Sequence, residues 1–147
     1  MLLAGSNGFL GAQIALRMLN NHDHTLYAMV RARDNEAAKL RLSRAWWDWP
    51  ELVSAIGNRV IVLAGDVSVY QLGLSDKQYH DLVRLVTHII HTAADMRLNG
   101  PIDQLRKTMY KEPKIYLNLP LQPRMTTVSL VFHMSQLLTW LAVEQEI

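Results

Sequence analysis

The chain has 147 residues, half of them hydrophobic and 19% charged, with a formal net charge of +2 at pH 7. This composition is typical of one globular domain with a sizeable core, and so small a charge gives no reason to expect a nucleic-acid or membrane-surface partner. The absence of cysteine excludes disulfides, cysteine-ligated zinc and a thiol nucleophile. The apolar segment 1–19 lacks the basic start of a signal peptide, and no stretch is long enough to span a bilayer, so we expect a cytoplasmic protein.

Strand and helix patterns alternate along residues 1–108. Short apolar or β-branched runs predict strands, at 1–4, 25–30, 59–64 and 87–91. Apolar residues at helical spacing and capping signals predict helices between and after them, at 8–20, 35–47, 51–56, 75–85 and from about 102. Asp34 is the expected N-cap of the second helix, and Ser75 with Gln78 forms a capping box. This alternation predicts an α/β fold, with a parallel sheet covered by helices on both faces.

Residues 109–147 break this alternation. Three of the five prolines fall in this segment, at positions 113, 120 and 123, and no rhythm of strand and helix is visible. We therefore divide the chain into a unit of alternating elements, 1–108, and a tail, 109–147. The first unit contains about four strands and every candidate cofactor-binding residue described below.

A glycine-rich turn follows the first predicted strand and opens the first predicted helix. Its sequence is Gly5-Ser6-Asn7-Gly8-Phe9-Leu10-Gly11. A backbone that approaches a pyrophosphate needs glycine, because a Cβ would block the approach, and the amides at a helix start attract the anion. The three glycines have the G-x-x-G-x-x-G spacing of short-chain dehydrogenases. We interpret the turn as a dinucleotide-binding loop; the alternative is a turn that only packs helix against strand.

The end of the second predicted strand indicates which dinucleotide binds. NAD-binding folds place an acidic side chain there to bond the ribose 2′-hydroxyl, but here the strand is followed by Arg31-Ala32-Arg33. The arginine fork suits a 2′-phosphate and can stack on adenine. Arg41, on the next predicted helix, is a candidate second clamp. These residues favour NADP(H); the alternative is a pair of solvated arginines at a strand end.

Two further strand ends carry candidate residues. Asp66, in Gly65-Asp66-Val67, can accept a hydrogen bond from the adenine amino group or can cap a turn. His91-Thr92-Ala93-Ala94 ends the fourth strand, where small residues allow the nicotinamide ribose to approach. Both segments lie where open α/β sheets bind ligands. We interpret Trp46-Trp47-Asp48-Trp49 as packing beneath a loop; the alternative is contact with a substrate or a partner domain.

Four segments together resemble the thioester reductase and fatty acyl-CoA reductase branch of the extended short-chain dehydrogenases. They are GSNGFLG (5–11), MVRAR (29–33), GDVSVYQLGLSD (65–76) and HTAAD (91–95), and Leu72-Gly73-Leu74-Ser75 is a specific marker of the branch. The resemblance covers 1–108 and implies the N-terminal half of an NADP-binding Rossmann domain, a truncated parallel sheet. It implies that Gly5, Gly8, Phe9, Leu10 and Gly11 hold the pyrophosphate, Arg31 and Arg41 hold the 2′-phosphate, Asp66 and Val67 flank adenine, and Thr92, Ala93 and Ala94 line the ribose. Ala4 departs from the usual threonine.

The resemblance also implies the chemistry. In this branch hydride passes from NADPH to the carbonyl of an acyl thioester, held on a carrier protein or CoA, and gives an aldehyde or alcohol. This reduction is assisted by a Ser or Thr, a Tyr, and a Lys four residues after the Tyr. Tyr110 and Lys114 have that spacing, but Pro113 spoils a helix there, so we assign no catalytic residue. The histidines have no metal-ligand spacing, so we assign no metal site.

We therefore expect a cofactor-binding fragment that is inactive alone. One alternative is a non-catalytic NADP-sensing module that kept the binding half of the domain. Another is a fragment of a sugar epimerase or dehydratase of the same superfamily, against which the arginines after the second strand and the Leu72–Ser75 marker argue.

The resemblance finally predicts how the chain should continue after residue 108. The family continues with a helix beginning N-V-x-G-T-x-N and a strand reading roughly H-V-S-T-A-Y-V-A-G. Codons compatible with Thr108 to Ile115, read one base upstream, encode N-V-Q-G-T-K-N. In the same frame, codons compatible with His133 to Ala142 encode the second motif. We therefore expect residues 109–147 to be a frameshifted and poorly structured tail.

Overall fold

The computed structural model describes residues 1–67, 69–92 and 126–128. Its helices and strands alternate along the chain as β1 (Leu2–Ala4), α1 (Phe9–Asn21), β2 (Leu26–Val30), α2 (Asn35–Ala45), α3 (Pro50–Ala55), β3 (Val60–Ala64), η1 (Tyr70–Gly73), α4 (Asp76–Leu85), β4 (His88–His91) and β5 (Thr126–Val128). The strands pair in parallel in the order β3-β2-β1-β4-β5. The predicted α/β fold is confirmed.

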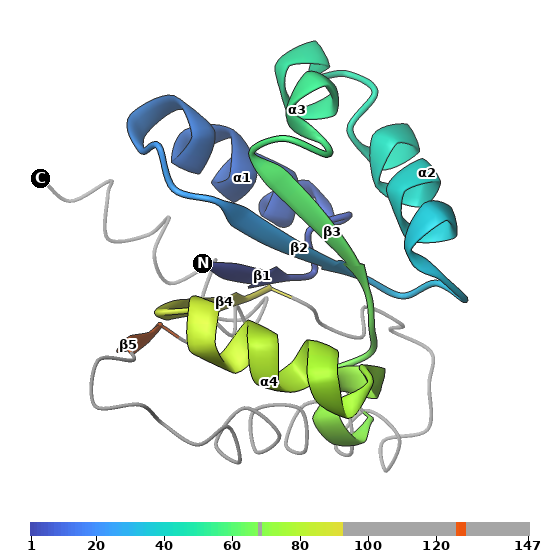
Figure 1. Cartoon of the computed structure of the whole chain (residues 1–147). Coiled ribbons are helices and arrows are strands. Elements are labelled where there is room, and N and C mark those ends of the chain that lie inside the picture. Colours follow the sequence, from blue (N-terminus) through green and yellow to red (C-terminus); the bar gives the residue numbers. More distant parts are fainter. Residues whose placement is uncertain (68, 93–125, 129–147) are drawn as a thin grey trace, which may run out of the picture.

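Helices cover both faces of the sheet. Figure 1 shows α1, α2 and α3 on one face, with α4 and η1 on the other. Because side chains alternate along a strand, neighbouring residues of β1 enter different cores. Leu3 packs in the core beneath α1 and α2, whereas Leu2 and Ala4 pack in the core beneath α4. The strands are apolar at nearly every position because the sheet is buried on both faces.

The order of the strands reverses direction beside β1. Leu3 pairs with Ala28 of β2 on one side and with Ile90 of β4 on the other. The chain moves outward from β1 through β2 to β3, then returns across the sheet to β4. Parallel sheets bind ligands outside the carboxyl ends of the strands, at the point where the strand order reverses. Here that point lies between β1 and β4.

The predicted caps at the starts of α2 and α4 are confirmed. The Asp34 carboxylate accepts a hydrogen bond from the backbone N–H of Ala37 at 2.7 Å, and Ser75 and Gln78 form both bonds of the capping box at the start of α4. The end of the second helix differs from the prediction, since α2 stops at Ala45 and not at 47. The reason is tertiary: Trp46 turns into the core as the C-cap of α2 and is fully buried.

Two elements were not expected from the sequence. The four predicted strands are present, and β5 adds a fifth that pairs with β4, with Thr127 opposite Ile89. Thr126, Thr127 and Val128 are β-branched and suit a strand, but they fall within the tail 109–147. The short helix η1 was also missed. The helix expected from about 102 and the remaining tail positions lie outside the described residues.

Candidate functional site

The three glycines of the loop after β1 have three different roles. Gly5 adopts φ +85°, a conformation that L side chains rarely take, and the Gly8 N–H closes the turn onto its carbonyl at 3.0 Å. A Cβ on Gly11 would lie 2.2 Å from the Gly5 oxygen, so Gly11 is needed for packing α1 against the loop. A Cβ on Gly8 would lie 3.4 Å from that same oxygen. Close packing within the described part of the chain therefore explains Gly11 far better than Gly8.

Ser6 fixes the buried side of this loop. Ser6 is fully buried, and its hydroxyl donates to the carbonyl of Met29 in β2 at 3.0 Å. Its own carbonyl accepts a hydrogen bond from the indole Nε1–H of Trp46 at 2.9 Å. The loop is thus tied to both β2 and the end of α2.

The start of α1 is suited to an anion. Gly8 is its N-cap and supplies no side-chain hydrogen bond, and the first turn contains no acidic residue. The first turns of α2, α3 and α4 each contain one, Glu36, Glu51 and Asp76. The orphan amides and positive dipole end of α1 therefore lack the carboxylate that accompanies the other helices. Phe9, predicted to border the pyrophosphate, is 77% exposed in this first turn, and Leu10 is half-buried.

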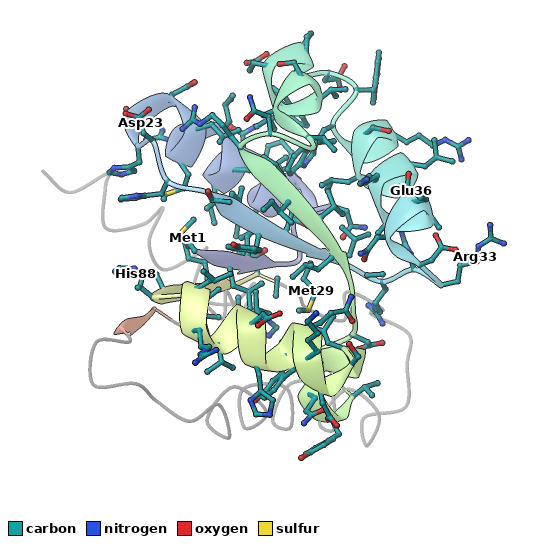
Figure 2. The ribbon with its side chains drawn as sticks, viewed as in Figure 1. Met1, Asp23, Met29, Arg33, Glu36 and His88 are labelled. Atoms are coloured by element: carbon teal, nitrogen blue, oxygen red, sulfur yellow. The ribbon has the colours of Figure 1, made fainter. Side chains whose placement is uncertain are left out.

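The structure brings Arg31 and Arg41 together. Arg31 is exposed directly after β2, and Nη1 of Arg41 donates to its backbone carbonyl at 2.8 Å. Arg33 instead pairs with Asp34 at 3.0 Å, and Figure 2 shows its side chain directed away from the sheet. The pKa of Asp34 lies below its ordinary value, mainly because the carboxylate accepts the Ala37 N–H, with the charge of Arg33 adding to the effect. Of the three predicted arginines, Arg41 and Arg31 are joined by a hydrogen bond from side chain to backbone.

The loop after β3 is braced by its own backbone. The Asp66 N–H donates to the carbonyl of Leu72 at 2.8 Å, and a Cβ on Gly65 would lie 2.8 Å from that oxygen. Gln71 and Leu72 both have positive φ, at 52° and 61°. Asp66 is half-buried, while the Val67 side chain belongs to the core beneath α4. Val67 can therefore face a ligand through its backbone more readily than through its side chain.

The end of β4 is tied to the end of β1. The backbone N–H and the hydroxyl of Thr92 both donate to the carbonyl of Ala4, at 2.9 and 3.0 Å. Thr92 thus lies beside the start of the glycine loop, at the carboxyl ends of β1 and β4. His91 is buried. Ala93 and Ala94, as well as Tyr110 and Lys114, lie outside the described residues.

Two negative findings apply to the described residues. Among them, no helix combines the length and apolar character required to cross a membrane. Within the same ranges, histidine, aspartate and glutamate side chains nowhere gather in a group of three that could hold a metal ion.

Sequence reasoning missed the contacts that shape these loops. Trp46 was expected to pack in the core, and it does so, but its bond to Ser6 joins residues 40 positions apart and no local pattern signals it. Its neighbour Trp47 is 73% exposed. Asn35 was missed as well: its side-chain oxygen accepts from the Ala64 N–H at 2.8 Å and joins the start of α2 to the end of β3.

The comparison with known families agrees with this geometry. The model of an NAD-binding family described as male sterility protein matches residues 3–140. The chain belongs to this family. The match covers every described loop at the carboxyl edge of the sheet and extends past residue 108.

Curated relatives are reductases and synthases. L-2-aminoadipate reductase of Saccharomyces cerevisiae is 34% identical over 110 residues, which are 72% of this chain and 8% of that protein. Isonitrile lipopeptide synthase of Mycobacterium tuberculosis is 35% identical over 101 residues, which are 64% of this chain and 4% of that protein. The chain thus spans less than a tenth of either relative.

Solved reductase domains share the fold. The reductase (R) domain of a nonribosomal peptide synthetase from Mycobacterium tuberculosis superposes with a TM-score of 0.73 at 27% identity, over 87% of this chain and 32% of that one. The terminal R domain of the myxalamid pathway gives 0.75 at 24% identity, over 87% and 33%, and this likeness concerns the fold alone. The chain corresponds to about a third of each domain.

Proposed function

We propose that this chain is a cofactor-binding fragment of an NADP(H)-dependent reductase of acyl thioesters. The substrate class is an acyl group bound to a carrier protein or to CoA, reduced to an aldehyde or an alcohol. The family supports a nicotinamide cofactor in general, and the reductase domains of peptide synthetases among the neighbours support the thioester class. The choice of NADP(H) and the roles of single residues rest on this chain's own geometry.

The observation that carries the proposal is the spare room at Gly8. A loop that only packed helix against strand would need Gly5 for its turn and Gly11 for its contact, and a Cβ would be tolerated at Gly8. A pyrophosphate lying against the start of α1 explains why position 8 is a glycine, because a side chain there would occupy the place of the pyrophosphate. The absence of a carboxylate from the first turn of α1 fits the same anion.

The 2′-phosphate distinguishes NADP(H) from NAD(H). Arg31 follows β2 at the position where NAD-binding folds carry an acid, and Arg41 reaches its backbone carbonyl from α2. A guanidinium group can donate several hydrogen bonds to one phosphate, and the proposal assigns those of Arg31 and Arg41 to the same 2′-phosphate. Because Arg33 already pairs with Asp34, we assign Arg33 a smaller contribution to 2′-phosphate binding than Arg31 or Arg41.

The remaining predicted contacts follow the carboxyl edge of the sheet. Asp66 would accept from the adenine amino group, with the Val67 backbone beside it, and Thr92 would border the nicotinamide ribose. When bound, the cofactor supplies hydride to the thioester carbonyl. The residues described here bind and orient it; the Ser or Thr, Tyr and Lys that assist the reduction are not assigned to any position of this chain.

Calorimetric titration tests the proposal. The chain should bind NADPH more tightly than NADH, and Gly8→Ala should weaken NADPH binding while the fold is retained. Incubation of the chain with NADPH and an acyl-CoA should cause no oxidation of NADPH. Equal affinity for NADPH and NADH would contradict the cofactor assignment, and turnover would contradict the expected inactivity.

A further inference from the structure

The end of α2 reaches into the glycine loop. Trp46, the C-cap of that helix, is fully buried, and its indole Nε1–H donates to the carbonyl of Ser6 at 2.9 Å. A buried indole N–H needs an acceptor. The acceptor here is a loop carbonyl, 40 residues earlier in the chain.

This hydrogen bond fixes the orientation of the whole peptide unit between Ser6 and Asn7. A peptide unit is planar and, when trans, directs its C=O and the following N–H to opposite sides. The described residues contain no cis peptide bond. Since the Ser6 carbonyl points toward buried Trp46, the Asn7 N–H points the opposite way, out of the loop. The Ser6 hydroxyl, held on the Met29 carbonyl at 3.0 Å, prevents the residue from turning.

We propose that Trp46 is a positioning residue for the pyrophosphate, which it serves by holding the Ser6–Asn7 peptide with the Asn7 N–H directed at the anion. The inference rests on the proposed function, because it takes the loop to be the phosphate site. It adds a part of the site that lies outside the glycine motif. Trp46 touches the loop and has no contact with the ligand.

A matched pair of variants tests this role. Trp46→Phe keeps an aromatic ring in the core and removes the N–H, whereas Trp47→Phe makes the same change at a side chain that is 73% exposed. In hydrogen exchange of the 147-residue chain, we expect the amides of Gly8 and Ala12, which bond the carbonyls of Gly5 and Gly8, to exchange about three- to tenfold faster in Trp46→Phe, relative to those of β2 and β3. Trp47→Phe should leave this ratio unchanged.

Ligand binding gives a second readout. NADPH contains the pyrophosphate and adenosine 2′-monophosphate does not. Trp46→Phe should weaken NADPH binding by about three- to tenfold and leave adenosine 2′-monophosphate binding unchanged. Equal loss for both ligands, or uniformly faster exchange throughout the sheet, would show a merely structural role and overturn the inference.

One measurement remains decisive if Trp46→Phe does not fold. In the unaltered chain, the assigned indole N–H resonance of Trp46 should shift on addition of NADPH and stay in place with adenosine 2′-monophosphate. No shift with bound NADPH overturns the inference. A chain that binds no NADPH refutes the proposed function, and the exchange ratio then decides separately whether Trp46 orders the loop.

Discussion

Two loops at the same edge of the sheet are held in opposite ways. The glycine loop after β1 takes its left-handed turn at Gly5 and is tied from behind by the side chains of Ser6 and Trp46. The loop after β3 is tied by its own backbone, Asp66 to Leu72, and places two non-glycine residues at positive φ. In the proposed function, the outer face of this first loop binds the pyrophosphate. In the second, backbone hydrogen bonds hold a short segment closed although two of its residues are strained.

Substitutions of two glycines in the first loop should differ most in their effect on stability. In Gly11→Ala the new Cβ meets backbone atoms of Gly5 and Ser6, at 2.2 and 2.8 Å. We expect the free energy of unfolding to fall by about 3 kcal/mol or more, measured by urea denaturation. In Gly8→Ala the new Cβ lies 3.4 Å from its nearest neighbour, and the free energy of unfolding should fall by only about 1 kcal/mol. If the two variants were equally stable, the separate roles assigned to these glycines would be wrong.

The next effect concerns the cation after β2. Arg31→Glu should weaken NADPH binding by about 1.5–3 kcal/mol, because a charge-assisted contact to the 2′-phosphate is lost, and should change NADH binding little. Arg33→Gln is the control, since Arg33 already pairs with Asp34, and its effect should be smaller. Calorimetry with both cofactors measures the difference. An equal loss of both cofactors in Arg31→Glu would remove Arg31 from the 2′-phosphate site.

The smallest effect compares strain in the two loops. Gln71→Gly replaces a residue at φ 52°, so it should raise the free energy of unfolding by up to about 1 kcal/mol, measured by thermal unfolding. The gain is small because the relief of strain is partly offset by the freedom of glycine in the unfolded chain. Gly5→Ala, at φ +85°, should lose about 1–2 kcal/mol. A clear loss of stability in Gln71→Gly would mean that its left-handed conformation carries no strain.

The sequence predicted what local patterns determine. Strand runs, the Asp34 cap, the Ser75–Gln78 box and the glycine spacing all depend on residues within a few positions of one another. The left-handed pair Gln71–Leu72 was missed because neither residue type favours that conformation. The Trp46–Ser6 bond was missed because only the tertiary fold brings the two together.

The tail remains the subject of a separate proposal. We propose that residues 109–147 are translated out of the family's frame, because two family motifs can be encoded one base upstream. The competing interpretation is a divergent continuation in the present frame, which the family match to residue 140 and the strand β5 accommodate. Sequencing the gene decides between them. The proposal predicts both motifs in one open frame, and a stop codon between them would refute it.

Binding of the two nicotinamide cofactors is the sharpest test of the proposed NADP(H) site. All contacts proposed for the adenosine half of NADP(H) come from residues 5–67, so the chain itself is the right sample for calorimetry. NADPH should bind at least about tenfold more tightly than NADH, a difference of about 1.4 kcal/mol in the free energy of binding. A chain that binds neither cofactor, or binds both equally, would contradict the proposed site.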